Sequence, residues 1–350
     1  MPFNRNCFLF GLGLSVGLSM GIGVAQAANE VAPNKRPVKV IADATIKVST
    51  PAGSGTLPLY VSVDWKVPQP GITRAVLVFH GRLRDADVYW RSAQKALSAS
   101  GDAQHTMMIV PQFLADADIP AHYLGQDFLH WQWESWMGGE NANGPAALSS
   151  FDAIDAILLQ LADRTRFPNL KDVVIAGHSG GAQVVQRYAV VGKGEELMAK
   201  LGVHTRYVVA NPSSYLYFNE ERPQETASCP QFNQWKYGWP GAPAYAQAKA
   251  PAAYEAAYAA RDVVYLLGTE DTNPNHPALD KTCPAEVQGA YRYIRGNSYF
   301  AYMQRRHPGM TSQQLVKVEG VGHDGDRMFT SPCGVSVLFG GAACVQPASK

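Results

Sequence analysis

The stretch DVVIAGHSGGAQVVQR, from Asp172 to Arg187, limits the possible folds of this chain more than any other. It begins with an apolar run, Val173 to Ala176, whose β-branched residues are typical of a strand buried on both faces of a parallel sheet. The glycine-rich segment Gly177 to Gly181 follows, and apolar residues then recur at helical spacing. A strand, a tight turn and a helix around G-x-S-x-G predict that the Ser179 hydroxyl is exposed at the sheet end. A glycine-rich turn that merely contains a serine is the alternative.

Backbone N–H groups near this turn are candidates for binding an oxyanion. The N–H of Gly180 lies directly after the serine, at the start of the predicted helix. A second donor is expected after the apolar strand Thr73 to Phe79, which ends in His80-Gly81. The backbone N–H of Arg82 is the predicted donor, and a contribution from Leu83 stays open. An ordinary strand-to-loop glycine is the competing interpretation, because a dipeptide is a weak motif.

A carboxylate and a histidine follow two later strands. The strand predicted over Asp262 to Leu267 is followed by Glu270 and Asp271, and we prefer Asp271 as the acid because a polar turn comes directly after it. One long helix is then expected over residues 285–306. The final predicted strand, Leu315 to Val318, leads through glycines to His323, and these glycines allow the loop to fold the histidine back over the sheet end.

Ser179, Asp271 and His323 therefore occur in the order nucleophile, acid and base. Since each of them follows a predicted strand, all three are expected to meet at one edge of the sheet. A neutral imidazole can take the proton of the serine hydroxyl, and the carboxylate holds the imidazole in the required tautomer. This chemistry needs neither a cofactor nor a metal ion.

The chain resembles the α/β-hydrolase-fold serine hydrolases over most of residues 59–329. The resemblance rests on His80-Gly81, Gly177 to Gly181, Gly268-x-x-Asp271 and Gly322-His323. It implies an α/β fold with a mostly parallel central sheet flanked by helices, and acyl transfer to water as the activity. Esterases, lipases, some peptidases and polyester depolymerases share this chemistry. A serine rather than an aspartate at the nucleophile position argues against dehalogenases and epoxide hydrolases.

These features predict an exported serine hydrolase that cleaves small-molecule or polymeric carboxylic esters through an acyl-enzyme. A peptidase or amidase of the same fold is the first alternative, because the residues do not distinguish ester from amide substrates. A non-catalytic binding protein of this fold is the second. Its usual mark is the loss of a catalytic residue, and this sequence keeps a candidate for each role.

Two aromatic-rich segments are candidates for substrate binding. The loop expected over residues 113–144 contains Trp131, Trp133 and Trp136, which can line a pocket or cover an edge of the core. Residues 212–261 are expected to form a cap-like insertion after the sixth strand, and Tyr215 near its start is a further candidate contact. A surface elaboration without substrate contact is the alternative for this insertion.

The N-terminus has the features of a secretory signal peptide over residues 1–27. Arg5 precedes the apolar, uncharged run Phe8 to Val24, and Ala25-Gln26-Ala27 fits a cleavage signature, so the mature chain is expected to begin at Ala28. A membrane anchor is the alternative, but the run is short and rich in glycine. Residues 28–350 are expected to form a single domain in the periplasm or outside the cell, with no stable membrane anchor.

Export places the cysteines in an oxidising compartment. Cleavage removes Cys7 and leaves an even number, which favours disulfides, although four cysteines allow three pairings. We favour Cys229 with Cys283 and Cys333 with Cys344, because each pair joins neighbours along the chain. No C-x-x-C pair occurs, which argues against a zinc cluster.

The balance of charges argues against a polyanionic partner. The full chain has 30 Lys and Arg against 29 Asp and Glu, and loss of Arg5 with no acidic residue leaves 29 of each. A formally neutral chain has no basic excess with which to bind nucleic acid or an anionic membrane. Its 46% hydrophobic content is that of a globular protein.

Overall fold

A mixed sheet organises the chain from Pro33 onward in the computed structural model, which describes residues 1–2, 32–341 and 344. Its strand order is β1-β2-β4-β3-β7-β8-β9-β10. β1 pairs antiparallel with β2 and β2 with β4, whereas every pair from β4 to β10 is parallel. This confirms the predicted mostly parallel sheet. The predicted signal peptide lies outside the described residues, apart from Met1 and Pro2.

The eight strands of this sheet are apolar where they are central and more polar where they form an edge. Their bounds are β1 (Ala44–Thr50), β2 (Gly53–Val61), β3 (Arg74–Phe79), β4 (Thr106–Pro111), β7 (Asp172–His178), β8 (His204–Ala210), β9 (Asp262–Gly268) and β10 (Gln313–Val318). From β3 to β9 nearly every residue is buried, because both faces are covered. On β1 exposed and half-buried residues alternate instead, as expected for a strand with one face in water.

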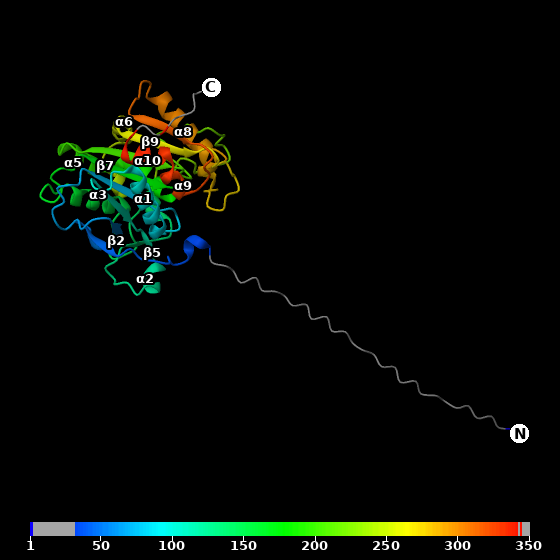
Figure 1. The fold of residues 1–350 in the computed structure, drawn as a ribbon. Helices are drawn as coiled ribbons and strands as arrows, with labels where there is room; N and C mark the ends of the chain where they lie inside the picture. The colour runs from blue at the N-terminus through cyan, green and yellow to red at the C-terminus, as the bar shows by residue number, and fades with distance from the viewer. Residues whose placement is uncertain (3–31, 342–343, 345–350) are drawn as a thin grey trace. The chain divides into compact units, whose positions relative to one another are not determined.

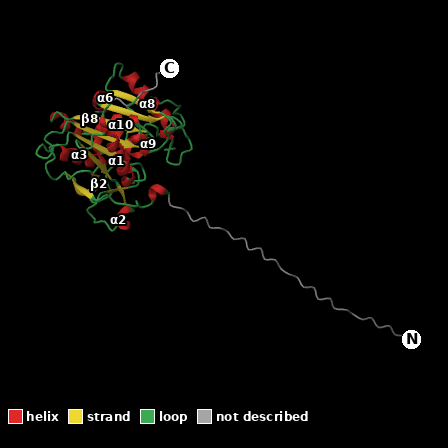
Figure 2. Cartoon of the chain, viewed as in Figure 1, coloured by secondary structure: helices red, strands yellow, loops and turns green. Residues whose placement is uncertain are grey.

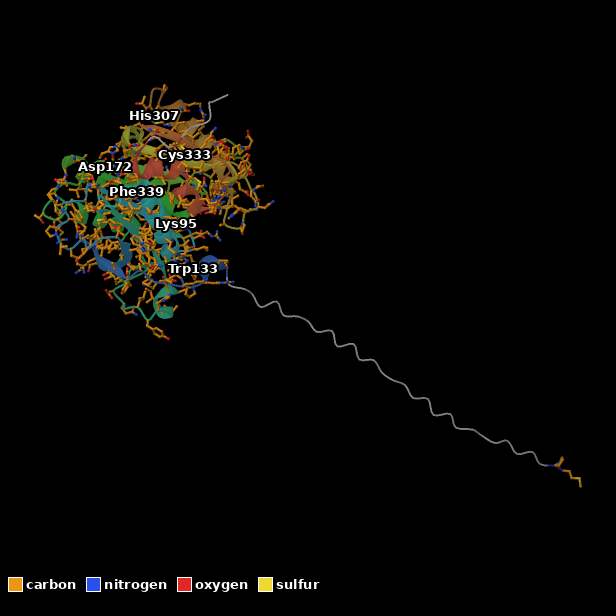
Figure 3. The ribbon with its side chains drawn as sticks, in the orientation of Figure 1. Lys95, Trp133, Asp172, His307, Cys333 and Phe339 are labelled. Atoms are coloured by element: carbon orange, nitrogen blue, oxygen red, sulfur yellow. A yellow bond between two sulfur atoms is a disulfide. The ribbon has the colours of Figure 1, made fainter. Side chains whose placement is uncertain are left out.

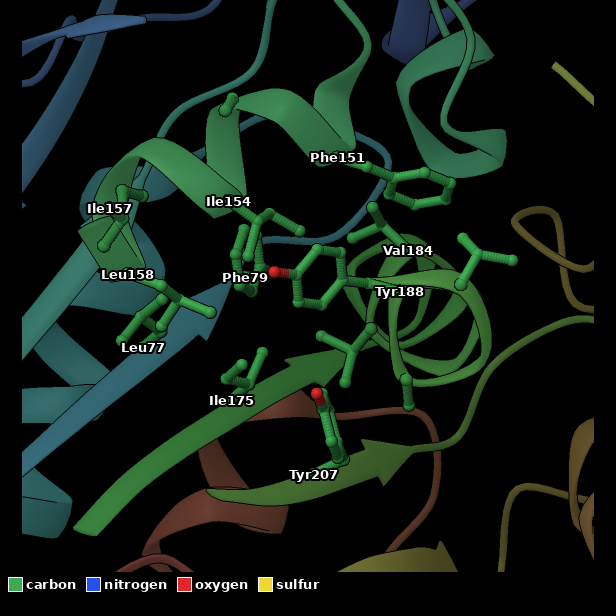
Figure 4. Packing of buried hydrophobic residues seen from close by; sticks show 14 of the residues in the cluster. Leu77, Phe79, Phe151, Ile154, Ile157, Leu158, Ile175, Val184, Tyr188 and Tyr207 are labelled. Carbon is green, nitrogen blue, oxygen red and sulfur yellow. The ribbon is translucent and has the colours of Figure 1, made fainter. Parts of the chain in front are cut away.

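Helices cover both faces of the sheet, as Figures 1 and 2 show. One face packs against α1 (Ala86–Ser100), α9 (Gly325–Thr330) and α10 (Pro332–Phe339). The other face packs against α3 (Ser150–Leu161), α4 (Gly180–Val191), α5 (Gly194–Lys200), α6 (Pro251–Ala260) and α8 (Arg292–Arg306). Figure 4 shows α3 and α4 directing apolar side chains onto the middle of the second face. The core is therefore two layers, one on each side of the strands.

Side-chain alternation along the strands assigns residues to these layers. Leu77 of β3 and Ile175 of β7 point to the α3–α4 side, whereas Val76 and Val174 point to the α1 side. Each strand therefore needs an apolar residue at every position. This requirement explains why the buried strands are continuous apolar runs in the sequence and why they could be recognised there.

Local sequence fixes the ends of two of these helices. Ser149 precedes α3 and its side chain accepts a hydrogen bond from the Phe151 N–H, while the Asp152 carboxylate accepts one from the Ser149 N–H. This reciprocal pair satisfies N–H groups that have no partner inside the helix. Gly101 ends α1 in the left-handed conformation, at φ +70°.

The expected single helix over residues 285–306 is wrong. The structure has a short α7 (Cys283–Glu286), a break, and then α8 (Arg292–Arg306). Gly289 lies in the break with φ +139°, a conformation that an α-helix cannot contain. Its carbonyl accepts a hydrogen bond from Arg295 Nε at 2.7 Å, so α8 holds the break in place.

Short elements fill the remaining connections. They are η1 (Pro33–Lys35), β5 (Leu114–Ala115), α2 (Asp118–Ala121), β6 (His130–Trp131), η2 (Ser135–Gly138) and η3 (Ala244–Gln247). Four of these short elements lie in residues 113–144, so the aromatic-rich segment has local structure rather than being one open loop. β5 and β6 pair with each other in a parallel two-stranded sheet.

Candidate active site

Ser179 occupies a sharp turn between β7 and α4. Its backbone has φ +58° and ψ −116°, a region that a residue with a Cβ rarely adopts. The turn is possible because the flanking glycines lack side chains. A Cβ on Gly177 would lie 2.3 Å from the Gly181 oxygen, and a Cβ on Gly181 would lie 2.2 Å from the Phe79 oxygen. The strain at Ser179 is therefore held by close packing of the strand against the helix.

The structure brings Ser179, His323 and Asp271 into one chain of contacts. His323 Nε2 lies 2.9 Å from Ser179 Oγ, and His323 Nδ1 lies 2.7 Å from Asp271 Oδ2. The three residues follow β7, β10 and β9, whose carboxyl ends meet at the same edge of the sheet. Glu270, the competing carboxylate, is exposed. The geometry thus places Asp271 rather than Glu270 against the imidazole.

Burial sets the charge states of this group. Burial lowers the pKa of His323 to about 4, although its hydrogen bond to Asp271 opposes the shift. Burial alone would raise the pKa of Asp271, but the His323 hydrogen bond and the Arg292 charge hold it below its usual value. At neutral pH the arrangement is therefore a hydroxyl, a neutral imidazole and a carboxylate. With Nδ1–H donated to Asp271, Nε2 is free to accept the serine proton.

Arg292 forms an ion pair with the Asp271 carboxylate. This contact was not predicted from the sequence. Arg292 Nη1 lies 3.4 Å from Asp271 Oδ1, and Arg292 Nε donates to Ser213 Oγ at 3.0 Å. Both members of the ion pair are almost fully buried. The sequence carries no signal for this role, because a buried arginine and a surface arginine look alike without the tertiary contacts.

Two further histidines flank the His323 ring. The His178 and His276 rings have centroids 4.6 Å and 4.9 Å from the His323 ring. His178 Nδ1 lies 2.9 Å from the Tyr89 hydroxyl, and burial holds the pKa of His178 well below its usual value. Burial and the nearby Arg292 also lower the pKa of His276. Neutral rings pack beside the imidazole, so these two histidines add no positive charge of their own that would oppose its protonation during turnover.

The two predicted oxyanion donors lie together. A Cβ placed on Gly180 would be 2.9 Å from the Arg82 backbone nitrogen, and both residues line one cavity with Ser179. Gly180 is the first residue of α4, where backbone N–H groups have no carbonyl partner within the helix. The two backbone segments are thus close enough to share one oxygen atom of a bound group.

Two cavities adjoin Ser179, and their linings share only Arg82, Ser179 and Ala278. We call the first the lysine cavity; it has a volume of about 290 Å³ and is lined by Arg82, Glu134, Ser179, Gly180, Lys236, Asp280, Lys281 and neighbouring residues. We call the second the histidine cavity; it has a volume of about 330 Å³ and is lined by Arg82, Asp85, Tyr89, His178, Ser179, His276, His323 and neighbouring residues. A group bound at Ser179 can therefore extend in two directions.

The aromatic residues that were predicted to contact substrate do not line the cavities beside Ser179. Trp131, Trp136 and Tyr215 are fully buried in the α3–α4 layer and line neither cavity beside Ser179. Trp136 stacks on Phe113 with centroids 5.0 Å apart. Only Trp133 is half-buried, and it lines a separate hollow that also contains Lys236. Tryptophan contributes apolar area wherever it packs, so the sequence did not distinguish core from pocket.

The segment 212–261 follows β8, the sixth strand of the main sheet along the chain. It contributes Ser213, Lys236 and Tyr237 to the lysine cavity. Cys229 in this segment is bonded to Cys283, which comes after β9. Cys333 is bonded to Cys344, and Figure 3 labels Cys333 on α10. These are the two pairings that the spacing of the cysteines favoured.

Between residues 32 and 341, no helix is both long enough and apolar enough to cross a membrane. The described residues also contain no group of three or more His, Cys, Asp or Glu side chains arranged to hold a metal ion.

Comparison with known proteins identifies the fold. No family model matches the chain, and no curated protein matches it. Among solved structures it is similar to LpqC, a poly(3-hydroxybutyrate) depolymerase from Bordetella parapertussis, with a TM-score of 0.59 and 20% identity over 90% of this chain and 96% of that one. It is also similar to poly(aspartic acid) hydrolase-1 from Sphingomonas sp. KT-1, with a TM-score of 0.54 and 21% identity over 84% and 96%. The chain has the α/β-hydrolase fold.

Proposed function

We propose that the protein is a serine hydrolase that cleaves carboxylic esters through an acyl-enzyme. The observation that carries this proposal is the continuous contact from Ser179 Oγ through His323 to Asp271 at the carboxyl edge of the sheet. These groups are the nucleophile, the base and the orienting acid that acyl transfer requires.

The reaction has two steps, formation of the acyl-enzyme and its hydrolysis. Ser179 Oγ attacks the ester carbonyl carbon while His323 Nε2 takes the hydroxyl proton, and the imidazolium then gives this proton to the departing alcohol oxygen. A water molecule next loses a proton to His323 and attacks the acyl-enzyme. The acid is released and the proton returns to Ser179. Asp271 keeps the imidazole oriented and stabilises its charged form throughout.

The carbonyl oxygen becomes negative in both tetrahedral intermediates. We assign its stabilisation to the backbone N–H groups of Gly180 and Arg82, which lie close together beside Ser179. Removing one donor of this kind from a hydrolase costs about 10² to 10³ in rate. Because these donors are backbone groups, their test is a substitution that moves the backbone rather than one that deletes a side chain.

The surroundings of this site are part of the same proposal. We propose that residues 28–350 form one exported domain and that residues 212–261 are an insertion over the site, since Lys236 and Tyr237 line the lysine cavity. The two disulfides are compatible with an oxidising compartment outside the cytoplasm. The names of the two similar structures, a depolymerase and a hydrolase, are consistent with hydrolysis of a small or polymeric substrate.

A p-nitrophenyl ester series from acetate to palmitate tests the proposal, with peptide anilides alongside and Ser179→Ala as the control. We expect ester turnover in the wild type that is lost in the variant. A fluorophosphonate should label the folded wild type at Ser179. Anilide turnover without ester turnover would favour a peptidase, and absence of both turnover and labelling in folded protein would contradict a hydrolase.

A further inference from the structure

The acidic and basic side chains of the lysine cavity differ in how many direct contacts they make within the protein. Its two carboxylates already have partners within the protein. Asp280 Oδ2 accepts a hydrogen bond from the Tyr237 hydroxyl at 2.7 Å, and Asp280 Oδ1 accepts one from Thr282 Oγ1 at 2.7 Å. Glu134 lies 3.7 Å from Arg82 across the cavity.

The two lysines of the same cavity form no direct salt bridge within the described residues, although Lys236 lies near enough to Asp280 for its charge to lower the pKa of that carboxyl. Within the described part of the chain, neither Lys236 Nζ nor Lys281 Nζ lies within 4.0 Å of a carboxylate oxygen, and Lys281 contacts the neutral amide oxygen of Asn275 instead. The cavity lining holds Arg82, Lys236 and Lys281 against Glu134 and Asp280, so its formal charge is one positive unit. Lys236 is half-buried, and burial lowers its pKa although the charges of Asp280, Glu134 and Glu140 oppose this shift. A bound carboxylate would add a direct partner to this ammonium group.

The position of Lys236 is fixed by its surroundings. Its backbone carbonyl accepts a hydrogen bond from the buried Arg187 Nε at 3.0 Å. The adjacent Tyr237 joins the wall formed by Asp280 and Thr282, and the Cys229–Cys283 disulfide links the same two segments. The backbone at Lys236 is therefore held in the wall of the cavity that also contains Ser179.

The proton path decides which part of a substrate enters this cavity. His323 lines the histidine cavity and not the lysine cavity. The departing alcohol must receive its proton from His323, so it belongs in the histidine cavity. The lysine cavity contains Ser179 and both predicted oxyanion donors, so it is left for the acyl group.

We propose that the enzyme prefers esters whose acyl group carries a carboxylate, and that Lys236 binds this carboxylate in the lysine cavity. This inference rests on the proposed ester hydrolysis and adds the substrate class. The product is a dicarboxylic acid: Ser179 takes the acyl group, the alcohol leaves with the proton from His323, and water supplies the oxygen of the new carboxylate. A volume of about 290 Å³ favours a short acyl chain over a long one. Lys236 is a specificity-determining residue in this proposal and takes no part in bond breaking.

Three esters of one chain length test the proposal: p-nitrophenyl adipate with a free terminal carboxylate, p-nitrophenyl hexanoate, and p-nitrophenyl 6-aminohexanoate. The wild type should have the highest kcat/KM with the adipate and the lowest with the aminohexanoate. Lys236→Met should reduce the ratio of adipate to hexanoate about tenfold or more, because a charge-assisted contact is lost. The ratio is the readout, because a change in the shape of the cavity wall affects both acyl chains, whereas loss of the charge affects the adipate alone.

Two variants separate a local contact from a general charge effect. Lys236→Arg keeps a positive charge and should retain the preference for adipate. Lys200→Met removes the same charge from an exposed position at the end of α5 and should leave the ratio unchanged. If Lys236→Met fails to fold, added salt provides the test in the wild type, because screening of a partly exposed ion pair should lower the ratio.

The outcomes distinguish the two proposals. Hexanoate turnover that depends on Ser179, with an adipate ratio at or below one, would overturn the charged-acyl preference and leave the hydrolase proposal standing. A preference for adipate that survives Lys236→Met, or that does not respond to salt where that variant fails to fold, would overturn the assignment to Lys236. Failure of all three esters in folded protein that fluorophosphonate does not label would contradict the hydrolase itself.

Discussion

The edge that holds Ser179 and the walls that surround it are built in different ways. Ser179, Asp271 and His323 each follow a buried parallel strand, so the sheet itself fixes their relative positions. The walls of the lysine cavity come mostly from segments between the main elements instead: residues 134–137, residues 213–237 and, with the largest share, residues 278–282. The comparison indicates that the sheet determines which reaction is possible, whereas the irregular segments determine which substrate fits.

Removing the nucleophile or the base should have the largest effect. We expect Ser179→Ala and His323→Ala each to lower kcat by about 10⁴ to 10⁶, because the remaining groups cannot form the acyl-enzyme. Both variants should keep their fold, since neither residue belongs to the apolar layers. Steady-state kinetics with circular dichroism as the folding control measures this. Residual activity within tenfold of the wild type would place the nucleophile elsewhere.

The two neighbouring carboxylates should differ by a smaller but still large factor. Asp271→Asn should lower kcat by about 10³ to 10⁴, because an amide cannot hold the imidazole tautomer in the same way. Glu270→Gln is the matched control and should change kcat by less than about twofold, since Glu270 is exposed. A greater loss in Glu270→Gln than in Asp271→Asn would show that the acid has been assigned to the wrong residue.

The three residues at the sheet edge could be predicted from the sequence alone. Ser179, Asp271 and His323 follow strands that are recognisable as apolar runs, and parallel strands place their carboxyl ends at one edge. Arg292 and the burial of Trp136 were not predictable in this way. Arg292 reaches Asp271 from a helix whose N-terminal boundary, at the Gly289 break, was itself misjudged. Trp136 stacks on Phe113 in the core. The spacing of the tryptophans along the sequence did not show whether this ring faces the core or a pocket.

The tryptophans of residues 113–144 provide the next test of the comparison. Trp136→Ala should lower the free energy of unfolding by about 3 to 5 kcal/mol, because a fully buried ring would leave a cavity. Trp133→Ala should cost about 1 kcal/mol, because Trp133 is half-buried and its main charged neighbour is Arg84, 6.0 Å from the ring. Urea unfolding monitored by far-UV circular dichroism measures both. Equal losses would mean that Trp133 is as much a core residue as Trp136.

The two disulfides should contribute unequally to stability. Cys229 and Cys283 are separated by 54 residues and Cys333 and Cys344 by 11, so the chain-entropy estimate is about 4 kcal/mol for the first bond and about 3 kcal/mol for the second. Paired cysteine-to-serine variants followed by thermal unfolding measure the difference. The first pair should also alter kcat/KM, since it joins two walls of the lysine cavity, whereas the second pair should not. Unchanged melting temperatures in both variants would exclude a stabilising role.

The smallest expected effect is that of mild acid on turnover. Burial lowers the pKa of His323 to about 4 from an ordinary 6.5, so the imidazole is neutral, and able to act as base, at any pH well above 4. At pH 5 about nine-tenths of the imidazole would still be neutral, against about 3% for a histidine with the ordinary pKa. We therefore expect kcat/KM to change by less than about twofold between pH 7 and pH 5.

Stability should fall over the same pH range in which turnover hardly changes. The pKa of His323 is lower in the folded state than in the unfolded state, and burial lowers that of His80 to about 4 as well. Below pH 6.5 these histidines take up protons in the unfolded chain but stay neutral in the folded protein. The free energy of unfolding therefore falls as the pH drops from about 6.5 towards 4. An enzyme that keeps its kcat/KM at pH 5 while its melting temperature falls would show both effects together. A loss of kcat/KM centred near pH 6.5, with no change in melting temperature, would mean that the imidazole is solvated like a surface histidine and that the sheet edge does not shield it.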